Sequence, residues 1–181
     1  QDWYLNKVLA NNLTRLATLE EARFAIDTGA IFPHLRVAPS EGAIPTAWGH
    51  GRYVLNMHGL KSCTRLWHDN ALPSFNDLTR FVRGKRCFST LDLSKMYYQI
   101  PLERSSKKYT AHRFNGRIYV YQVTPQGERN SASTATRLMR FLLTEDIEAG
   151  NVIVYIDDVI VAATDFATMT KLLQRVFQRL A

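Results

Sequence analysis

Two runs of five apolar residues enclose a pair of aspartates near the C-terminal end of the sequence, and no other feature restricts the fold as much. The runs are Val152–Ile156 and Val159–Ala163, and the pair between them is Asp157-Asp158. Neither run alternates between apolar and polar residues, which predicts a hairpin of two strands covered on both faces, with a rigid tip. An aspartate pair is common in ordinary turns. Adjacent like charges also repel, and a bound cation would relieve the repulsion.

A third aspartate follows another strand-like segment. Asp92 closes the apolar run that starts at Cys87, where a buried charge would also need a partner. Carboxylate oxygens are ligands that Mg²⁺ prefers. Three aspartates from two strands could therefore hold two Mg²⁺ ions for in-line phosphoryl or nucleotidyl transfer, with Mn²⁺ as a substitute.

The remaining pattern predicts an α+β fold, with an antiparallel sheet packed on helices. Asn115-Gly116 is a strong hairpin signal, and Thr18 and Gly29 are placed to begin and end a helix. The predicted helices cover residues 1–30, 74–82, 131–148 and 165–180, and the predicted strands cover 52–57, 87–93, 109–114, 117–123, 152–156 and 159–163.

Charge and composition narrow the function classes. The chain has 23 Lys and Arg against 16 Asp and Glu. Residues 80–117 contain ten of these basic residues and two acids, which suits either a polyanion such as nucleic acid or a solvated basic surface. No apolar run approaches the roughly 20 residues that cross a bilayer, so we expect no membrane partner. Two cysteines indicate a reducing compartment.

Several sequence blocks resemble one enzyme family. Tyr155–Asp158 has the form of the YxDD box of reverse transcriptases, and Phe88–Leu102 is similar to their preceding aspartate motif in gypsy-type LTR retrotransposons and retroviruses. Thr124–Gly127, followed by Asn130-Ser131, resembles the P-Q-G motif. Upstream, Gly51–Asn56 and Leu72–Leu78 resemble the fingers strand and the segment leading into the palm.

The resemblance implies the fingers and palm of a right-hand polymerase. Residues 1–84 and 100–130 would form the fingers, with the N-terminal helices unplaced, and residues 85–99 and 131–181 would form the palm. The thumb and ribonuclease H regions would be absent. The implied function is RNA-directed and DNA-directed DNA polymerisation of dNTPs on a template–primer. The implied location is intracellular, in the cytoplasm or in virus-like particles, with the nucleus as an alternative.

The resemblance also assigns residue roles. Asp92, Asp157 and Asp158 would be the catalytic residues and the ligands of two metal ions. The nucleotide-binding residues would be Arg52 at the triphosphate, the backbone N–H groups of Lys95 and Met96, Tyr97 as a steric gate against the ribose 2′-hydroxyl, and Gln126. Tyr155 and Gly127 would lie near the primer and template. As alternatives, Tyr97 is a core aromatic, Gln126 a turn residue and Arg52 a surface cation.

Some positions depart from the family pattern. Residues 40–51 contain no Lys or Arg, although family fingers usually carry a lysine there, and Asn56 and Ala132 replace the usual Asp and Pro. A second hypothesis is therefore a retroelement-derived domain without polymerase activity that binds nucleic acid or protein. A third, an RNA-dependent RNA polymerase, fits less well because Tyr97 would exclude ribonucleotides. We expect the protein partners of this chain to be a second copy of the chain or further polyprotein domains.

Overall fold

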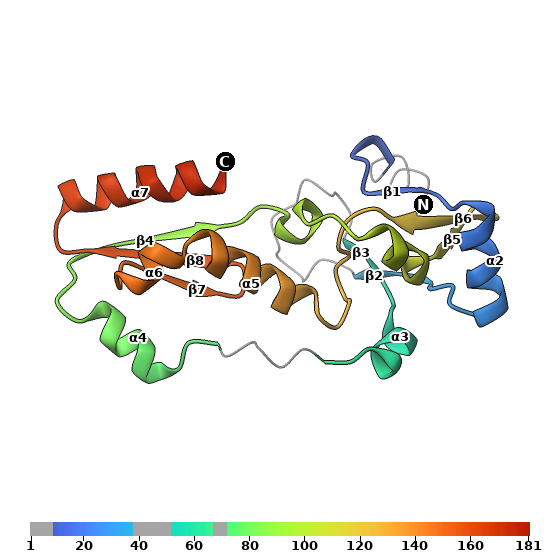
Figure 1. Cartoon of the computed structure of the whole chain (residues 1–181), viewed down its shortest axis with the longest axis horizontal. Helices are drawn as coiled ribbons and strands as arrows, with labels where there is room; N and C mark the ends of the chain where they lie inside the picture. Colours follow the sequence, from blue (N-terminus) through green and yellow to red (C-terminus); the bar gives the residue numbers. More distant parts are fainter. Residues whose placement is uncertain (1–8, 38–51, 67–71) are drawn as a thin grey trace. The chain divides into compact units, whose positions relative to one another are not determined.

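The computed structural model describes residues 9–37, 52–66 and 72–181, with only the backbone described for 34–37 and 52–55. The fold is α+β with antiparallel sheets, as predicted. The chain divides into two compact units (Figure 1). The first unit contains Gln1–Arg65 and Tyr97–Ser131, and the second contains Leu66–Met96 and Ala132–Ala181.

The second unit is built on a three-stranded antiparallel sheet. Its strands are β4 (Cys87–Asp92), β7 (Val152–Tyr155) and β8 (Asp158–Ala163), with β8 in the centre. Valines at alternate positions of β7 and β8 are buried, whereas Ile153 and Ile160 are only partly buried and Tyr155 is 39% exposed. The face of the hairpin that carries Ile153, Tyr155 and Ile160 is therefore only partly covered by the rest of the chain. The prediction that both faces are covered is wrong for this face.

Among the described residues of the second unit, four helices accompany the sheet. They are α4 (Phe75–Val82), α5 (Ser131–Leu142), α6 (Thr144–Glu148) and α7 (Phe166–Leu180), and α7 packs against β8 and β4. A capping box between Ser74 and Asp77 begins α4, and the Asp165 carboxylate accepts a hydrogen bond from the Thr168 N–H at the start of α7. By its contacts α4 groups with the second unit; the division into fingers and palm, with residues 1–84 in the fingers, stays a prediction.

The single helix predicted over residues 131–148 is wrong, because the structure breaks it at Leu143. This residue has φ −107° and ψ 17°. Its N–H still donates to the Met139 carbonyl, and its carbonyl still accepts from the Ile147 N–H, both at 3.0 Å. Leu143 is fully buried. Because Leu143 is buried, as is Met139 four positions earlier, the apolar spacing continues across the break. The sequence therefore carries no signal for the break.

A buried carboxylate connects α6 to α7. Asp146 has 0% exposure, and the guanidinium groups of Arg175 and Arg179 form ion pairs with it. Within the described part of the chain, neither carboxylate oxygen accepts a hydrogen bond of regular geometry. The two ionic contacts therefore compensate the buried charge, and Arg179 also pairs with the exposed Glu145.

In the part of the first unit that the structure describes, the strands form two small antiparallel sheets. One has the order β1 (Thr14–Leu16), β6 (Arg117–Tyr121), β5 (His112–Phe114), and the other pairs β2 (His34–Val37) with β3 (Arg52–Leu55). The connecting helices are α2 (Leu19–Thr28), α3 (His58–Cys63) and the 3₁₀ helix η2 (Arg104–Thr110), while η1 (Met96–Gln99) lies where the two units join in sequence.

The local signals in this unit are confirmed where they concern caps and turns. Thr18 and Glu21 form the capping box of α2, and Gly29 ends it at φ +66°. Asn115 and Gly116 both have positive φ, at +45° and +72°, between β5 and β6, as a tight hairpin turn requires.

Two predicted elements in this unit are wrong. The helix predicted over residues 1–30 is interrupted by β1, which pairs with β6 about 105 positions along the chain, with Thr14 opposite Tyr121; residues 1–8 of this prediction lie outside the described residues. The strand predicted from residue 109 begins only at His112, because the preceding residues form η2. Long-range pairing decides the first case. No described helix is long and apolar enough to cross a membrane.

Candidate active site

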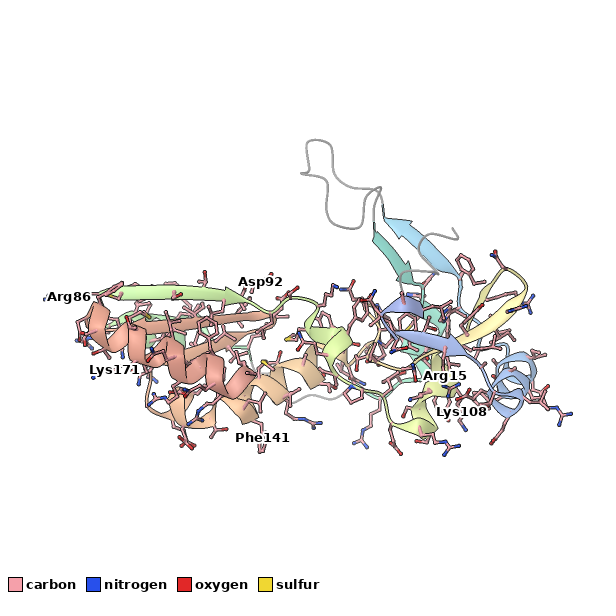
Figure 2. All side chains as sticks on the ribbon, turned by 90° about the horizontal axis from the view of Figure 1, so that it is seen from above. Arg15, Arg86, Asp92, Lys108, Phe141 and Lys171 are labelled. Carbon is pink, nitrogen blue, oxygen red and sulfur yellow. The ribbon has the colours of Figure 1, made fainter. Side chains whose placement is uncertain are left out.

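Strand register brings Asp92 and Asp158 together. In the ladder between β4 and β8, Cys87 lies opposite Ala163 and Asp92 lies opposite Asp158. Figure 2 shows Asp92 at the end of β4, with Arg86 before its other end. Directly paired residues on antiparallel strands have Cβ atoms about 4.5–5.5 Å apart on one face. Two of the three predicted metal ligands are therefore neighbours across a strand pair.

The third predicted ligand occupies the hairpin tip. Tyr155 pairs with Asp158, so Ile156 and Asp157 form a two-residue loop. The Leu93 N–H donates to the Asp157 carbonyl at 3.4 Å, which ties the tip to the segment after β4. The structure thus gathers Asp92, Asp157 and Asp158, with Tyr155, at one end of one sheet.

The tip also holds an unusual backbone conformation that the sequence analysis missed. Ile156 has φ +59°, which is rare for a β-branched residue. Such strain costs of order 1–3 kcal/mol and persists where the surrounding structure imposes it, often at functional sites. Here the Tyr155–Asp158 pairing and the Leu93 hydrogen bond impose it. The residue type gave no signal, since Gly or Asn would be expected at this position.

The electrostatics of this sheet end favour a cation. Asp92, Asp157 and Asp158 are exposed, and across the described residues none of their carboxylates makes a hydrogen bond or an ion pair. Like charges directly opposite on two strands are destabilising. Acceptor-only oxygens without competing donors fit a hard cation such as Mg²⁺.

The side chains are not gathered into a closed ligand cluster. Among residues 9–37, 52–66 and 72–181, no three His, Cys, Asp or Glu side chains lie where they could hold a metal ion together. The three aspartates are exposed and can change rotamer without disturbing the core. The backbone register is compatible with the predicted metal site, and the ligand assignment stays a prediction.

The loop after Asp92 contains two predicted phosphate donors. Lys95 has φ +54° and Met96 is buried at 4% exposure. A turn with one left-handed residue can direct backbone N–H groups toward an anion. However, the Met96 N–H donates to the Leu93 carbonyl at 3.2 Å, so a phosphate would have to share this donor.

The other predicted site residues belong to the first unit. Tyr97 is half-buried at the start of this unit's second segment, and Gln126 is half-buried before Gly127, which has φ +97°. Ser131 Oγ donates to the Pro125 carbonyl at 2.9 Å and holds this turn. Arg52 begins β3 opposite Val37, and its side chain lies outside the described atoms. The lysine-free segment 40–51 also lies outside the described residues. These nucleotide-binding and template-near roles stay predictions.

Comparisons with known proteins place the chain in a family. The family described as reverse transcriptase (RNA-dependent DNA polymerase) matches residues 4–181. The retrovirus-related Pol polyprotein of transposon 297 from Drosophila melanogaster is 29% identical over 110 residues, covering 61% of this chain and 10% of the polyprotein. The corresponding polyprotein of transposon gypsy from the same organism is 34% identical over 91 residues, covering 50% of this chain and 9% of the polyprotein.

Solved structures agree with the fold. The prototype foamy virus protease–reverse transcriptase matches with a TM-score of 0.75 and 25% identity, over 97% of this chain and 21% of that chain. The foamy viral enzyme in complex with double-stranded DNA matches with a TM-score of 0.77 and 24% identity, over 98% of this chain and 33% of that chain. The chain spans about a tenth of the two transposon relatives' length and between 21% and 33% of these solved chains. The match over residues 4–181 shows that the chain belongs to the reverse transcriptase (RNA-dependent DNA polymerase) family.

Proposed function

We propose that this chain forms the fingers and palm of an RNA-directed DNA polymerase that also copies DNA. It would transfer nucleotides from dNTPs to a primer by a two-metal mechanism. The observation that carries the proposal is the β4–β8 register, which sets Asp92 opposite Asp158 beside the strained tip that holds Asp157. The family match over residues 4–181 supports the same activity.

The three aspartates would hold two Mg²⁺ or Mn²⁺ ions. When bound, the ions supply Lewis-acid activation of the primer hydroxyl and charge neutralisation at the pyrophosphate. The chain contributes the fixed position of the carboxylates, because the paired ends of β4, β7 and β8 leave the backbone little freedom. The ion pair between the metals and the carboxylates would also remove the repulsion between Asp92 and Asp158.

The remaining proposed roles concern the incoming nucleotide and the duplex. Arg52 and the loop at Lys95 and Met96 would contact the triphosphate, Gln126 would lie beside the nucleotide, and Tyr97 would exclude a ribose 2′-hydroxyl. Tyr155 and Gly127 would lie near the primer and template.

The proposed partner is a template–primer duplex, held through the basic residues of segment 80–117. Solved relatives include foamy viral complexes with double-stranded DNA and with an RNA/DNA hybrid. Further polyprotein domains or a second copy of the chain would complete the grip on the duplex. The proposed location is intracellular, in the cytoplasm or in virus-like particles, with the nucleus as an alternative.

Primer extension tests the proposal. The assay uses poly(rA)/oligo(dT) and dTTP with Mg²⁺ or Mn²⁺, and it compares the chain with Asp157→Asn/Asp158→Asn. Asp27→Asn, an exposed aspartate on α2, is the matched control. We expect extension by the chain and by the control, and none by the double variant. Equal extension by all three proteins would refute the assignment of the aspartates. Salt-sensitive duplex binding without extension would support the nucleic-acid-binding alternative instead.

A further inference from the structure

The turn that follows β6 carries Gln126 and Gly127, the two residues proposed above to lie beside the incoming nucleotide and near the template. Both ends of this turn are fixed within the first unit. Pro125 is fully buried, and Ser131 is 4% exposed, with its Oγ donating to the Pro125 carbonyl at 2.9 Å. The residues between them, 126–130, are partly or largely exposed. The core therefore fixes the ends of the turn, and other contacts have to fix its tip.

Arg129 supplies two contacts at the tip. One nitrogen of its guanidinium, Nη1, donates hydrogen bonds to the Lys61 carbonyl at 2.7 Å and to the Thr64 carbonyl at 3.2 Å. Asn130 Nδ2 donates to the Arg65 carbonyl at 3.0 Å. The three carbonyls belong to the last turn of α3 and to the two residues after it, where a helix leaves carbonyl groups without a partner inside the helix. The tip of the turn is thus bound to the C-terminal end of α3.

The other end of α3 is anchored in the core of the first unit. Met57, the residue before the helix, is 2% exposed and packs with Phe32 and Tyr121. Two residues separate α3 from β3, whose first residue is Arg52. The helix therefore joins the strand that carries the proposed triphosphate contact to the turn that carries Gln126.

We propose that Arg129 is a positioning residue for nucleotide binding. By binding the tip of the turn to α3, it would hold Gln126 in place relative to β3. The inference rests on the proposed polymerase function, because it assigns Arg129 a role through the nucleotide-binding residues proposed above. In this role Arg129 acts through the backbone of the turn and does not contact the nucleotide.

The hydrogen-bond pattern predicts that lysine can replace Arg129. Both bonds come from one nitrogen, and an ammonium has three donors, so the planar fork of the guanidinium is not needed. Glutamine is shorter and uncharged, and hydrogen bonds to uncharged groups are weaker than those to charged groups. Arg129→Lys should therefore retain the hold on α3, and Arg129→Gln should lose it.

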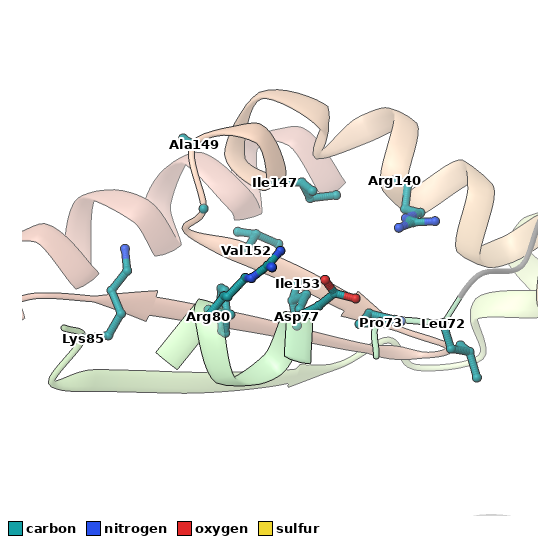
Figure 3. Close-up of a pocket in the computed structure, with 12 residues that line it drawn as sticks. Leu72, Pro73, Asp77, Arg80, Lys85, Arg140, Ile147, Ala149, Val152 and Ile153 are labelled. Atoms are coloured by element: carbon teal, nitrogen blue, oxygen red, sulfur yellow. The ribbon is translucent and has the colours of Figure 1, made fainter. Parts of the chain in front are cut away.

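Hydrogen exchange of the full chain without nucleotide measures this hold. In Arg129→Gln, peptides covering residues 58–65 and 124–131 should exchange about tenfold faster, the effect of losing a charge-assisted hydrogen bond. Arg129→Lys should stay within about twofold, as should the matched control Arg23→Gln, which changes an exposed arginine on α2 of the same unit. The internal reference is a peptide from β7, whose first two residues line a cavity of about 550 Å³ in the second unit (Figure 3). Unchanged exchange in Arg129→Gln would overturn the proposal.

Primer extension on poly(rA)/oligo(dT) with increasing dTTP tests the role in nucleotide binding. Arg129→Gln should raise the KM for dTTP about tenfold and leave kcat within about twofold, the pattern of lost substrate binding. Arg129→Lys should restore the KM, and Arg23→Gln should match the unaltered chain. Fluorescence anisotropy should show the same template–primer affinity for all four proteins.

The outcomes separate this inference from the proposed function. Faster exchange in Arg129→Gln with an unchanged KM for dTTP would overturn the positioning role and leave the polymerase activity standing. A loss of template–primer affinity in Arg129→Gln would assign the arginine to a phosphate contact and would also overturn the proposal. No extension by the unaltered chain would refute the proposed function, and with it the role of Arg129 in nucleotide binding.

Discussion

Removing the arginines that contact Asp146 should destabilise the second unit more than removing Asp146 itself. The Asp146 side chain is 0% exposed and cannot reach water, whereas the side chains of Arg175 and Arg179 are 46% and 25% exposed and can. Loss of the arginines therefore leaves a buried charge without compensation. Loss of the carboxylate leaves two cations that remain solvated.

The magnitudes follow from this asymmetry. An uncompensated buried charge costs about 3–5 kcal/mol, so Arg175→Met/Arg179→Met should lower the free energy of unfolding by about 4 kcal/mol. Arg175→Met alone should cost about 2 kcal/mol, because Arg179 Nε remains 3.5 Å from Asp146 Oδ2. Asp146→Asn keeps the side-chain shape and should cost about 1 kcal/mol.

Urea unfolding followed by far-UV circular dichroism measures these differences. A loss of 2 kcal/mol should lower the midpoint by about 1 M for a unit of this size. Hydrogen exchange of peptides from α6 and α7 locates the effect in the second unit. Glu145→Gln is the control, since the Glu145 side chain is 78% exposed and its pair with Arg179 should contribute less than about 1 kcal/mol. If Asp146→Asn costs as much as the double arginine variant, the buried charge is not the cause.

Four further predictions concern the site and the first unit. Asp157→Asn should abolish Mn²⁺ binding, measured by electron paramagnetic resonance, while the circular dichroism spectrum is unchanged; equal Mn²⁺ affinity would contradict the two-metal proposal. Tyr97→Ala should allow ribonucleotide incorporation in single-nucleotide primer extension, and unchanged discrimination would place the gate elsewhere. Ile156→Gly should stabilise the second unit by about 1 kcal/mol in urea unfolding, because Gly adopts positive φ without strain, and a destabilised variant would show that the Ile156 side chain matters more than its backbone. The hydrogen bonds from Arg15 lower the pKa of Glu21 from 4.5 to about 2, so the stability lost in Glu21→Gln should be largest above about pH 4.5 and should disappear as the pH falls toward 2; a loss that does not change with pH would show that the charge of Glu21 contributes nothing.

The sequence alone determined the local features of this protein and its family. The capping boxes at Thr18 and Ser74, the hairpin at Asn115-Gly116 and the YxDD box from Tyr155 to Asp158 are each encoded in a few neighbouring residues. Short-range hydrogen bonds and backbone preferences decide such features, so they can be read without knowing the rest of the fold.

Only the tertiary structure decided which distant residues meet. The strand β1 in a segment with helical signals and the burial of Asp146 both depend on partners far away in the sequence. The same holds for the register that sets Asp92 opposite Asp158. The physical reason is that ladder hydrogen bonds and burial gain free energy from contacts across the fold, and these override local preferences of less than about 1 kcal/mol per residue.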